Sequence, residues 1–228
     1  MPEGQSLVLA ARRLAPIVGH EVTEGALAGA TIEAVEPYGK HLLIRTDDGR
    51  TLDVHLGMHG RVRLRPSGAG SGRHVLRTPA GDAVIHHPSR YDVRRSRTHR
   101  LRLGPDVLGD FDPEEYLRRA RLVDRPIGEA LLDQRVLAGV GNVAKSEALW
   151  RCRVDPFAPV SALGDDRLLA LAAEATDVLR HGVDDGGRLP REVYKRGGRP
   201  CPRCGGPIRR AVQGEARRST YWCPACAV

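Results

Sequence analysis

Four cysteines near the carboxyl end have the spacing of a metal site. Cys201 and Cys204 form one Cys-x2-Cys pair, and Cys223 and Cys226 form a second pair after 18 intervening residues. This doubled spacing is typical of structural zinc sites, in which four thiolates surround Zn²⁺. Two disulfides are the alternative, which a cytosolic environment disfavours because it keeps thiols reduced. The presence of two Cys-x2-Cys pairs disfavours a redox-active cysteine pair. Since protein fills all four positions and leaves none for water, the sequence predicts one structural Zn²⁺ per chain.

A second reactive group lies at the amino terminus, which reads Met1-Pro2-Glu3-Gly4. Removal of Met1 leaves Pro2 with a free secondary amine, and an ordinary α-amino pKa of about 8 keeps a fraction of it neutral. A neutral amine attacks an aldehyde-like carbon and forms an iminium, as Schiff-base enzymes do. The Glu3 carboxylate beside it can move protons. On these four residues alone an ordinary frayed terminus is the preferred interpretation, and the remaining motifs reverse that preference.

The charge of the chain favours a polyanionic partner. It contains 36 Lys and Arg against 28 Asp and Glu, for a net charge of +8. Residues 94–102 carry five arginines, and residues 188–218 carry ten Lys or Arg against two Glu. A high-GC genome explains abundant arginine but not this clustering, which suits nucleic acid. Aromatic residues make up only 4% of the chain, too few for a platform that stacks single-stranded bases, so duplex DNA is the expected partner.

No targeting segment and no apolar run long enough to cross a membrane is visible in the sequence. We therefore expect a cytoplasmic, nucleoid-associated protein with no membrane partner.

Apolar periodicity predicts an α+β fold in three parts. Residues 1–103 are expected to form a β-sandwich that opens with one helix over residues 5–18, with Ser6 as its cap and Gly19 after its end. Short β-type runs follow, separated by turn residues. These runs are residues 30–32, 42–44, 52–56, 61–64, 74–76 and 83–86.

The pattern changes at about residue 104. Asp112-Pro113-Glu114-Glu115 is a good helix start, with a cap, proline at the first helical position and acid in the first turn. Residues 104–194 are therefore expected to form a helical domain. Its helices are predicted over residues 113–122, 126–134, 142–152 and 165–181. Residues 195–228 are expected to form a zinc-finger β-hairpin, with limbs at 208–212 and 219–222 joined by the metal.

Residues 133–143 contain a turn with two glycines, Gly139 and Gly141, between a predicted apolar helix and a helix capped by Asn142. Exposed amides at a helix amino terminus bind phosphate well when no side chain blocks the approach. A plain helix-turn-helix connector explains the same residues at least as well.

Three further residues stand out. Lys40 lies at the mouth of a strand, where a lone lysine is usually a solvated charge. Met58, one of two methionines, stands between closely spaced glycines, and an apolar side chain on such a loop can wedge between base steps. A buried methionine that fills a gap is the alternative. Cys152, at a predicted helix end, is interpreted as a packed thiol.

In combination the motifs resemble the formamidopyrimidine-DNA glycosylase and endonuclease VIII family of base-excision repair enzymes. They are MPEG, YGKHLL, HLGMHG, LLDQRVLAGVGN, VYKRGGRPCPRCGGPI and RRSTYWCPAC, in that order, from Met1 to Cys226. The resemblance implies an amino-terminal β-sandwich, a helical domain with a helix–two-turn–helix motif and a zinc-finger hairpin, with DNA between the domains. It also implies DNA glycosylase and abasic-site lyase activity.

The resemblance assigns catalysis to three residues. Pro2 attacks C1′ of the damaged nucleotide, Glu3 is the acid/base partner, and Lys40 assists near the lesion phosphate. The iminium acidifies the C2′ proton, so that β,δ-elimination cuts the strand. Other residues are expected to bind DNA, by filling the void left by the flipped base, gripping phosphates or steering the duplex. These are Met58, His59, Arg94, Arg95, Asn142 and Arg218.

The chain also departs from the family pattern. Gln5-Ser6 replaces the usual Pro-Glu, and the segment over residues 181–192 is short where the glycosylases carry a loop that closes over oxidised purines. The short segment favours the endonuclease VIII branch and oxidised pyrimidines as substrates. We expect a monomer acting on damaged duplex DNA.

Two other functions are consistent with parts of the sequence. One is a catalytically altered family member that binds abasic or bulky-lesion DNA without efficient lyase activity, which intact Pro2, Glu3 and Lys40 disfavour. The other is an unrelated zinc-ribbon transcription factor, which leaves the MPEG terminus and the β-rich half unexplained.

Overall fold

A computed structural model describes residues 2–95 and 102–227. The contacts divide the chain into two compact units, residues 1–101 and 102–228, which are described separately below. The helical region predicted over residues 104–194 and the cysteine hairpin both belong to the second unit. The finer division of this unit at residue 194 stays a prediction.

The first unit opens with helix α1 (Gly4–Leu14), which continues into the short helix η1 (Ala15–Ile17). Leu7, Leu14 and Ile17 are fully buried on one face, so the predicted helix is confirmed. Its cap is different from the expected one, because Glu3 precedes the helix in an extended conformation and its carbonyl accepts a hydrogen bond from the Ser6 amide (2.9 Å). Ser6 lies inside the helix instead of capping it.

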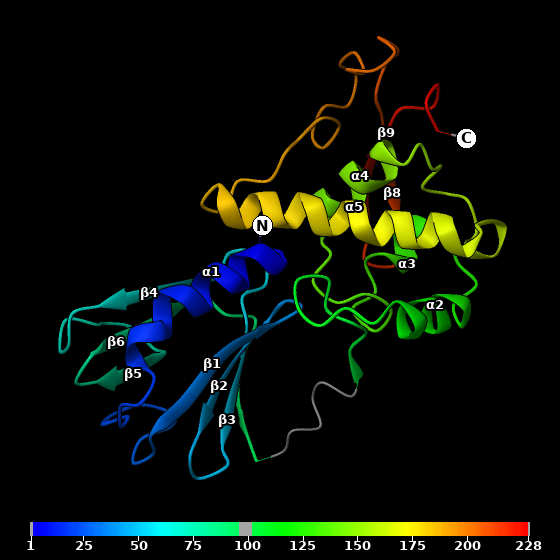
Figure 1. Ribbon diagram of the computed structural model, residues 1–228. Coiled ribbons are helices and arrows are strands. Elements are labelled where there is room, and N and C mark those ends of the chain that lie inside the picture. Colours follow the sequence, from blue (N-terminus) through cyan, green and yellow to red (C-terminus); the bar gives the residue numbers. More distant parts are fainter. Residues whose placement is uncertain (1, 96–101, 228) are drawn as a thin grey trace. The chain divides into compact units, whose positions relative to one another are not determined.

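Seven strands form two antiparallel sheets, which confirms the predicted sandwich (Figure 1). One sheet has the order β1-β2-β3-β7 and the other has the order β4-β6-β5. The first sheet contains β1 (Ile32–Tyr38), β2 (His41–Thr46), β3 (Thr51–His55) and β7 (Arg90–Arg94). The second contains β4 (Arg61–Arg65), β5 (Val75–Thr78) and β6 (Gly81–His86). Helix α1 contacts β1, β2 and β4 and closes the sandwich along one side.

The register of the first sheet separates an apolar face from a polar face. Leu52 and Val54 on β3 belong to the hydrophobic core, together with residues of α1 and of the second sheet. Asp53 and His55 alternate with them and therefore lie on the opposite face. Strand β7 was not predicted, because its residues are mostly polar, and only Arg94 at its end belongs to the predicted arginine cluster. It forms by pairing with β3, where Val54 lies opposite Tyr91.

The second unit is helical apart from its hairpin. Its helices are α2 (Pro113–Arg121), α3 (Ile127–Ala130), α4 (Asn142–Arg151), η3 (Val160–Ala162) and α5 (Asp165–Asp184). The cap predicted for α2 is confirmed, since the Asp112 carboxylate accepts a hydrogen bond from the Glu115 amide (3.0 Å). Helix α5 extends beyond its predicted end at residue 181.

The helix predicted over residues 126–134 is wrong in extent, because α3 ends at Ala130. Beyond Ala130, side chains form hydrogen bonds with the backbone N–H and C=O groups. Asp133 accepts a hydrogen bond from the Arg135 amide (2.9 Å), and Gln134 Nε2 donates to the carbonyls of Leu132 (3.0 Å) and Val140 (3.1 Å). Such side-chain bonds compete with helical hydrogen bonds. The result is two successive turns that lead into α4.

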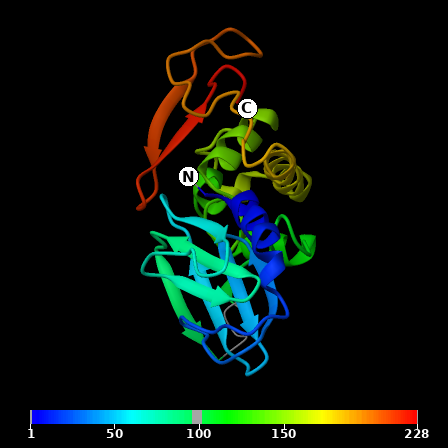
Figure 2. The same ribbon diagram turned by 90° about the vertical axis from the view of Figure 1, so that its left-hand side faces the viewer.

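The chain ends in the predicted hairpin, β8 (Arg209–Gln213) and β9 (Arg218–Trp222), which Figure 2 shows in orange to red. Strand β9 packs against α4. Among the described residues, none of the helices has the length and apolar character needed to cross a bilayer.

Candidate functional site

The amino-terminal residues lie at the start of α1. Pro2 is half-buried and Glu3 is fully buried, immediately before the first helical turn. Helix amino termini favour negative charge, because the first amides of the helix carry partial positive charge. The structure therefore places a buried carboxylate beside the proline whose amine could act as a nucleophile.

Lys40 lies in the turn between β1 and β2. Gly39 adopts a positive φ of 56° in this turn, a conformation that glycine tolerates and most residues do not. Lys40 is half-buried, and its charge helps to lower the pKa of His55 on the neighbouring strand. The lysine therefore lies close to the polar face of the first sheet.

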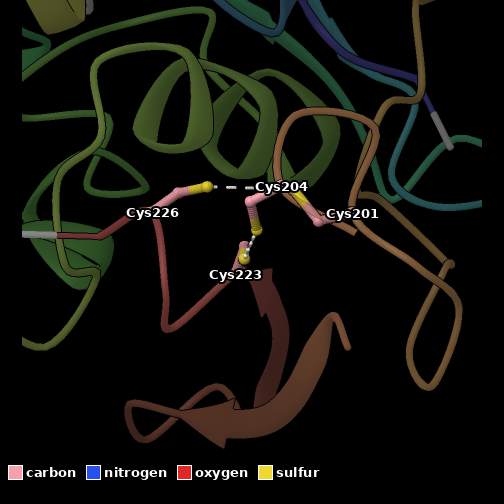
Figure 3. Close-up of side chains that lie close together, drawn as sticks. All are labelled: Cys201, Cys204, Cys223 and Cys226. Carbon is pink, nitrogen blue, oxygen red and sulfur yellow. Dashed lines mark hydrogen bonds between the residues drawn. The ribbon is translucent and has the colours of Figure 1, made fainter. Parts of the chain in front are cut away.

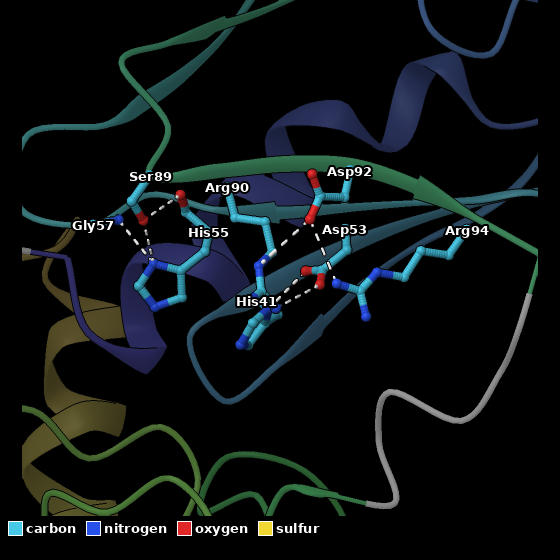
Figure 4. Close-up of polar contacts among 8 residues, drawn as sticks. All are labelled: His41, Asp53, His55, Gly57, Ser89, Arg90, Asp92 and Arg94. Atoms are coloured by element: carbon cyan, nitrogen blue, oxygen red, sulfur yellow. Dashed lines mark hydrogen bonds and ion pairs between the residues drawn. The ribbon is translucent and has the colours of Figure 1, made fainter.

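On this face a buried carboxylate joins two strands (Figure 4). Asp53 Oδ1 lies 2.7 Å from His41 Nδ1, and Asp53 Oδ2 lies 3.4 Å from an Arg90 guanidinium nitrogen. Arg90 and Arg94 also pair with Asp92, at 3.7 and 3.4 Å. Apart from Arg94, sequence reasoning assigned none of these residues to a site. The available signal was Asp53, a charged residue between Leu52 and Val54 in a strand whose polar and apolar residues alternate.

His55 lies beside this group, with its ring 5.0 Å from the ring of His41 in an edge-on arrangement. Its Nδ1 accepts a hydrogen bond from the Gly57 amide (3.0 Å), which places the single proton of the neutral ring on Nε2. Ser89 Oγ lies 2.8 Å from the same nitrogen. Burial, followed by the charges of His41 and Lys40, lowers the pKa of His55 to about 4. The ring is therefore neutral at physiological pH.

The loop after His55 presents Met58 to solvent. The Met58 side chain is 52% exposed, and His59 is also exposed, so the interpretation as a buried gap filler is wrong. The two glycines that flank this loop, Gly57 and Gly60, are required because a side chain would not fit at either position. A Cβ at Gly57 would lie 2.9 Å from the Ser89 Cβ, and one at Gly60 would overlap the Leu56 carbonyl oxygen. The tight backbone therefore directs an apolar side chain outward.

The predicted arginine cluster begins on β7. Arg94 is half-buried at the end of the strand, and Arg95 follows it in an exposed position. The rest of the cluster, apart from Arg102, lies in residues 96–101, outside the described part of the chain.

In the second unit the four predicted cysteine ligands come together (Figure 3). Their sulfur atoms all lie within 4.8 Å of one another, with 3.9 Å between Cys201 and Cys226 and 3.4 Å between Cys204 and Cys223. A tetrahedral Zn²⁺ with four Zn–S bonds of about 2.3 Å requires sulfur separations of about 3.8 Å. The four thiols therefore fit a structural zinc ion.

Helix α4 contributes to the surroundings of this metal site. The Trp150 indole N–H donates to Cys201 Sγ (3.3 Å), and the Arg203 guanidinium lies 4.4 Å from the Trp150 ring centre. Hydrogen bonds to a thiolate orient the ligand and stabilise its negative charge. The other cysteine, Cys152, has a pKa raised to about 11, mainly by burial, which agrees with its interpretation as a packed thiol.

Asn142 is not the cap of α4, because that position belongs to Gly141 and Asn142 is the first helical residue. The Asn142 side chain is buried and donates a hydrogen bond to the Ser219 carbonyl of β9 (2.6 Å). One turn later, Lys145 is also fully buried and donates to the Thr220 hydroxyl (2.8 Å). Two polar side chains of α4 thus bind the hairpin, and the sequence analysis had given Lys145 no role at a site.

Arg218, the first residue of β9, lines a pocket of about 430 Å³. Arg125 and Arg135 line the same pocket, and both pair with Asp133, at 3.4 and 2.7 Å. Three guanidinium groups therefore lie around one opening. The carboxylates of Glu129, Asp133 and Glu215 line the pocket as well, so its charges balance, although guanidinium groups bind phosphate oxygens well.

Three family domains cover almost the whole sequence. Residues 4–95 match the formamidopyrimidine-DNA glycosylase N-terminal domain. Residues 103–191 match the formamidopyrimidine-DNA glycosylase H2TH domain, and residues 198–228 match the zinc finger found in FPG and IleRS. The zinc-finger match and the four-cysteine cluster support Zn²⁺ as the metal.

Curated relatives carry two kinds of name. A probable endonuclease 8 2 of Streptomyces coelicolor is 38% identical, covering 99% of this chain and 94% of the relative. A formamidopyrimidine-DNA glycosylase of Thermus thermophilus is 35% identical, covering 99% and 98%.

Solved structures agree with this relationship. The crystal structure of the MutM (Fpg) protein of T. thermophilus superimposes with a TM-score of 0.83 at 32% identity, covering 99% of this chain and 98% of that one. The Lactococcus lactis glycosylase, bound non-covalently to DNA with an abasic site, shares the fold with a TM-score of 0.84 at 24% identity, covering 99% of both chains. The chain therefore belongs to the formamidopyrimidine-DNA glycosylase and endonuclease VIII family, the DNA glycosylases of base-excision repair.

Proposed function

We propose that this chain is a bifunctional DNA glycosylase and abasic-site lyase whose nucleophile is the amine of Pro2. The observation that carries the proposal is the fully buried Glu3 carboxylate next to Pro2, at the start of α1, in a member of this family. A carboxylate in that position can accept a proton from the proline amine and return it to a leaving group.

In the proposed reaction the Pro2 nitrogen attacks C1′ of a damaged nucleotide that has been flipped out of the duplex. The bond between C1′ and the base breaks, and the base leaves with a proton. The bond between C1′ and O4′ then breaks as O4′ takes up a proton, and the opened sugar is held as an iminium. This cation acidifies the C2′ proton, so elimination breaks the 3′ phosphate ester, and a second elimination breaks the 5′ ester. Lys40 is proposed to assist near the lesion phosphate.

DNA is proposed to contact exposed residues of both units. In the first unit these are Met58, which would enter the space of the flipped base, with His59, Arg94 and Arg95 nearby in sequence. In the second unit Arg218 would bind phosphate at its arginine-lined pocket. Asn142 is proposed to act through the amides at the start of α4, since its side chain already binds Ser219. The L. lactis protein was solved with abasic-site DNA, which supports damaged duplex DNA as the partner here. We also propose that the protein acts as a monomer in the cytoplasm, at the nucleoid.

Borohydride trapping tests the nucleophile. The wild-type protein with Met1 removed should give a covalent adduct with abasic-site DNA, because borohydride reduces the iminium. Pro2→Gly, or protein that retains Met1, should lose most of the adduct, while Cys152→Ser should trap as well as the wild type. Equal trapping by protein that retains Met1 would transfer the role to Lys40. Binding without trapping by the wild type would favour a catalytically altered DNA-binding protein.

We propose oxidised pyrimidines as preferred substrates, as in the endonuclease VIII branch. Support comes from the length of the chain after α5, since only residues 185–192 separate the end of this helix from Val193. So short a segment does not suffice for a lid over a purine. Single-turnover excision of 5-hydroxyuracil should be faster than excision of 8-oxoguanine opposite cytosine in the same duplex context. Faster removal of 8-oxoguanine would overturn the branch assignment and leave the glycosylase assignment intact.

A further inference from the structure

Three acidic side chains on the polar face of the first sheet differ in how far they are buried. Glu36 pairs with Arg45 (2.9 Å), and Asp92 pairs with Arg94 (3.4 Å). The side chains of Glu36 and Asp92 are 34% and 53% exposed, whereas the Asp53 side chain is only 2% exposed. Asp53 therefore differs from the other two by being buried together with His41, while its second partner, Arg90, reaches solvent.

A buried carboxylate is costly unless it is paired and hydrogen-bonded. Asp53 meets this requirement through His41 and Arg90, but an apolar side chain at the same position would stabilise a sheet at least as well. Stability of the sheet therefore does not account for the group. The carboxylate instead fixes the relative positions of two strands, because one of its oxygens pairs with β2 and the other with β7.

The connections of Asp53 lead to the segments that carry the proposed DNA contacts. His41 is the first residue of β2 and directly follows Lys40. Arg90 is the first residue of β7, the strand that ends at Arg94. The His41 ring also lies edge-on to His55, which accepts the Gly57 amide at the start of the Met58 loop.

We propose that Asp53 is a positioning residue, which holds the Lys40 turn, the Met58 loop and strand β7 in one arrangement before DNA binds. This inference rests on the proposed function of Lys40 and Met58. Enzymes gain rate when catalytic groups are held in place in advance, and the supporting side chains are commonly buried and hydrogen-bonded.

The test compares Asp53→Asn with Glu36→Gln. Both changes replace a carboxylate by its amide on the same face of the sheet, but only the first removes a buried charge. Single-turnover cleavage of an abasic-site duplex should slow by about 10- to 100-fold with Asp53→Asn, because small displacements of catalytic groups have effects of this order. The dissociation constant for the same duplex should change by less than about 3-fold, since phosphate contacts supply most of the affinity. Glu36→Gln should leave both quantities near the wild-type values.

Hydrogen exchange provides a readout that does not depend on catalysis. In Asp53→Asn, amide exchange should become faster at residues 39–41, 57–60 and 90–94 together, while the strands of the second sheet keep their protection. Faster exchange confined to β3, or an unchanged cleavage rate, would overturn the inference. If Asp53→Asn does not fold, Arg90→Met removes one partner from a more exposed position, and the same three segments should respond.

The two proposals fail in different ways. Wild-type protein that does not cleave abasic-site DNA contradicts the proposed function, whereas the exchange pattern still decides whether Asp53 holds the three segments.

Discussion

The two units of the molecule hold the side chains that are proposed to contact DNA by different physical means. In the first unit a hydrogen-bonded sheet fixes the backbone, and the group around Asp53 orients what lies at the strand ends. In the second unit a two-stranded hairpin depends on the cysteine site and on buried side chains of α4. A two-stranded hairpin is marginal by itself in water, so it needs bonds that a larger sheet does not need.

The hydrophobic clusters show the same contrast. The core of the first unit draws on α1 and both sheets. The cluster at the hairpin consists of Val193, Ile208 and three of the four cysteines, with Trp150 and Tyr221 packed against it. Because so little apolar surface is buried there, metal binding has to supply much of the folding free energy. The predictions below test this difference, beginning with the largest expected effect.

Removal of zinc should unfold the hairpin and leave the first unit intact. Without the metal no bond joins the two Cys-x2-Cys pairs, and the small cluster around them does not compensate. The chain contains two tryptophans, Trp150 and Trp222, and both belong to this region, so tryptophan fluorescence should change when a chelator is added. Hydrogen exchange of β1–β7 should stay the same. Purified, active protein that contains no zinc would contradict the assignment of the metal.

Lys145→Met should lower the free energy of unfolding of the second unit by about 1–3 kcal/mol. The change keeps the apolar stem but removes the donor to Thr220, and a buried polar group that loses its partner has a cost of this order. Denaturant unfolding followed by tryptophan fluorescence measures the effect. Lys195→Met is the control, because it makes the same chemical change at an exposed position. Equal destabilisation by both variants would mean that the bond between α4 and β9 does not support the hairpin.

The first unit should lose stability between about pH 6.5 and pH 4 through His55. The pKa of His55 is lowered to about 4 in the folded protein, against 6.5 for an ordinary histidine. In this window the unfolded chain binds a proton and the folded chain does not, so acid favours unfolding, and the contribution is complete above pH 6.5. Because the ring is only half-buried, solvent reduces the effect, and we expect about 1–2 kcal/mol.

Thermal unfolding as a function of pH measures this contribution, with His55→Gln as the comparison. The variant should show a flatter pH dependence of the first transition over the same window. An identical slope in both proteins would show that the pKa of His55 is not lowered in the folded state.

Glu36→Gln should have the smallest effect, below about 1 kcal/mol, on the stability of the first unit. Its ion pair with Arg45 is on the same sheet as Asp53 but faces solvent, and exposed pairs contribute little. High salt should abolish the difference between variant and wild type. A loss as large as that of Asp53→Asn would remove the distinction between buried and exposed carboxylates on this face.

Local sequence patterns sufficed for the elements whose signals are contained within a few residues. The cap, proline and acids at residues 112–115 start α2 as predicted, and the Cys-x2-Cys pairs come together as metal ligands. Strand β7 could not be found in this way, because its alternation is weak and it forms only through pairing with β3. The extent of α3 was missed for a related reason, since Asp133 and Gln134 bond to backbone groups only once the turns have formed.

The sequence by itself determined the family, the fold class, the zinc ligands and the candidate nucleophile, because these depend on residue type and spacing along the chain. Tertiary structure alone decided that Asn142 is bonded to Ser219 and that Lys145 is buried against Thr220. It also decided that Met58 is exposed and that Asp53 joins His41 to Arg90. Burial and partnership between distant residues depend on strand register and on helix packing, and these arise only when segments far apart in the chain meet.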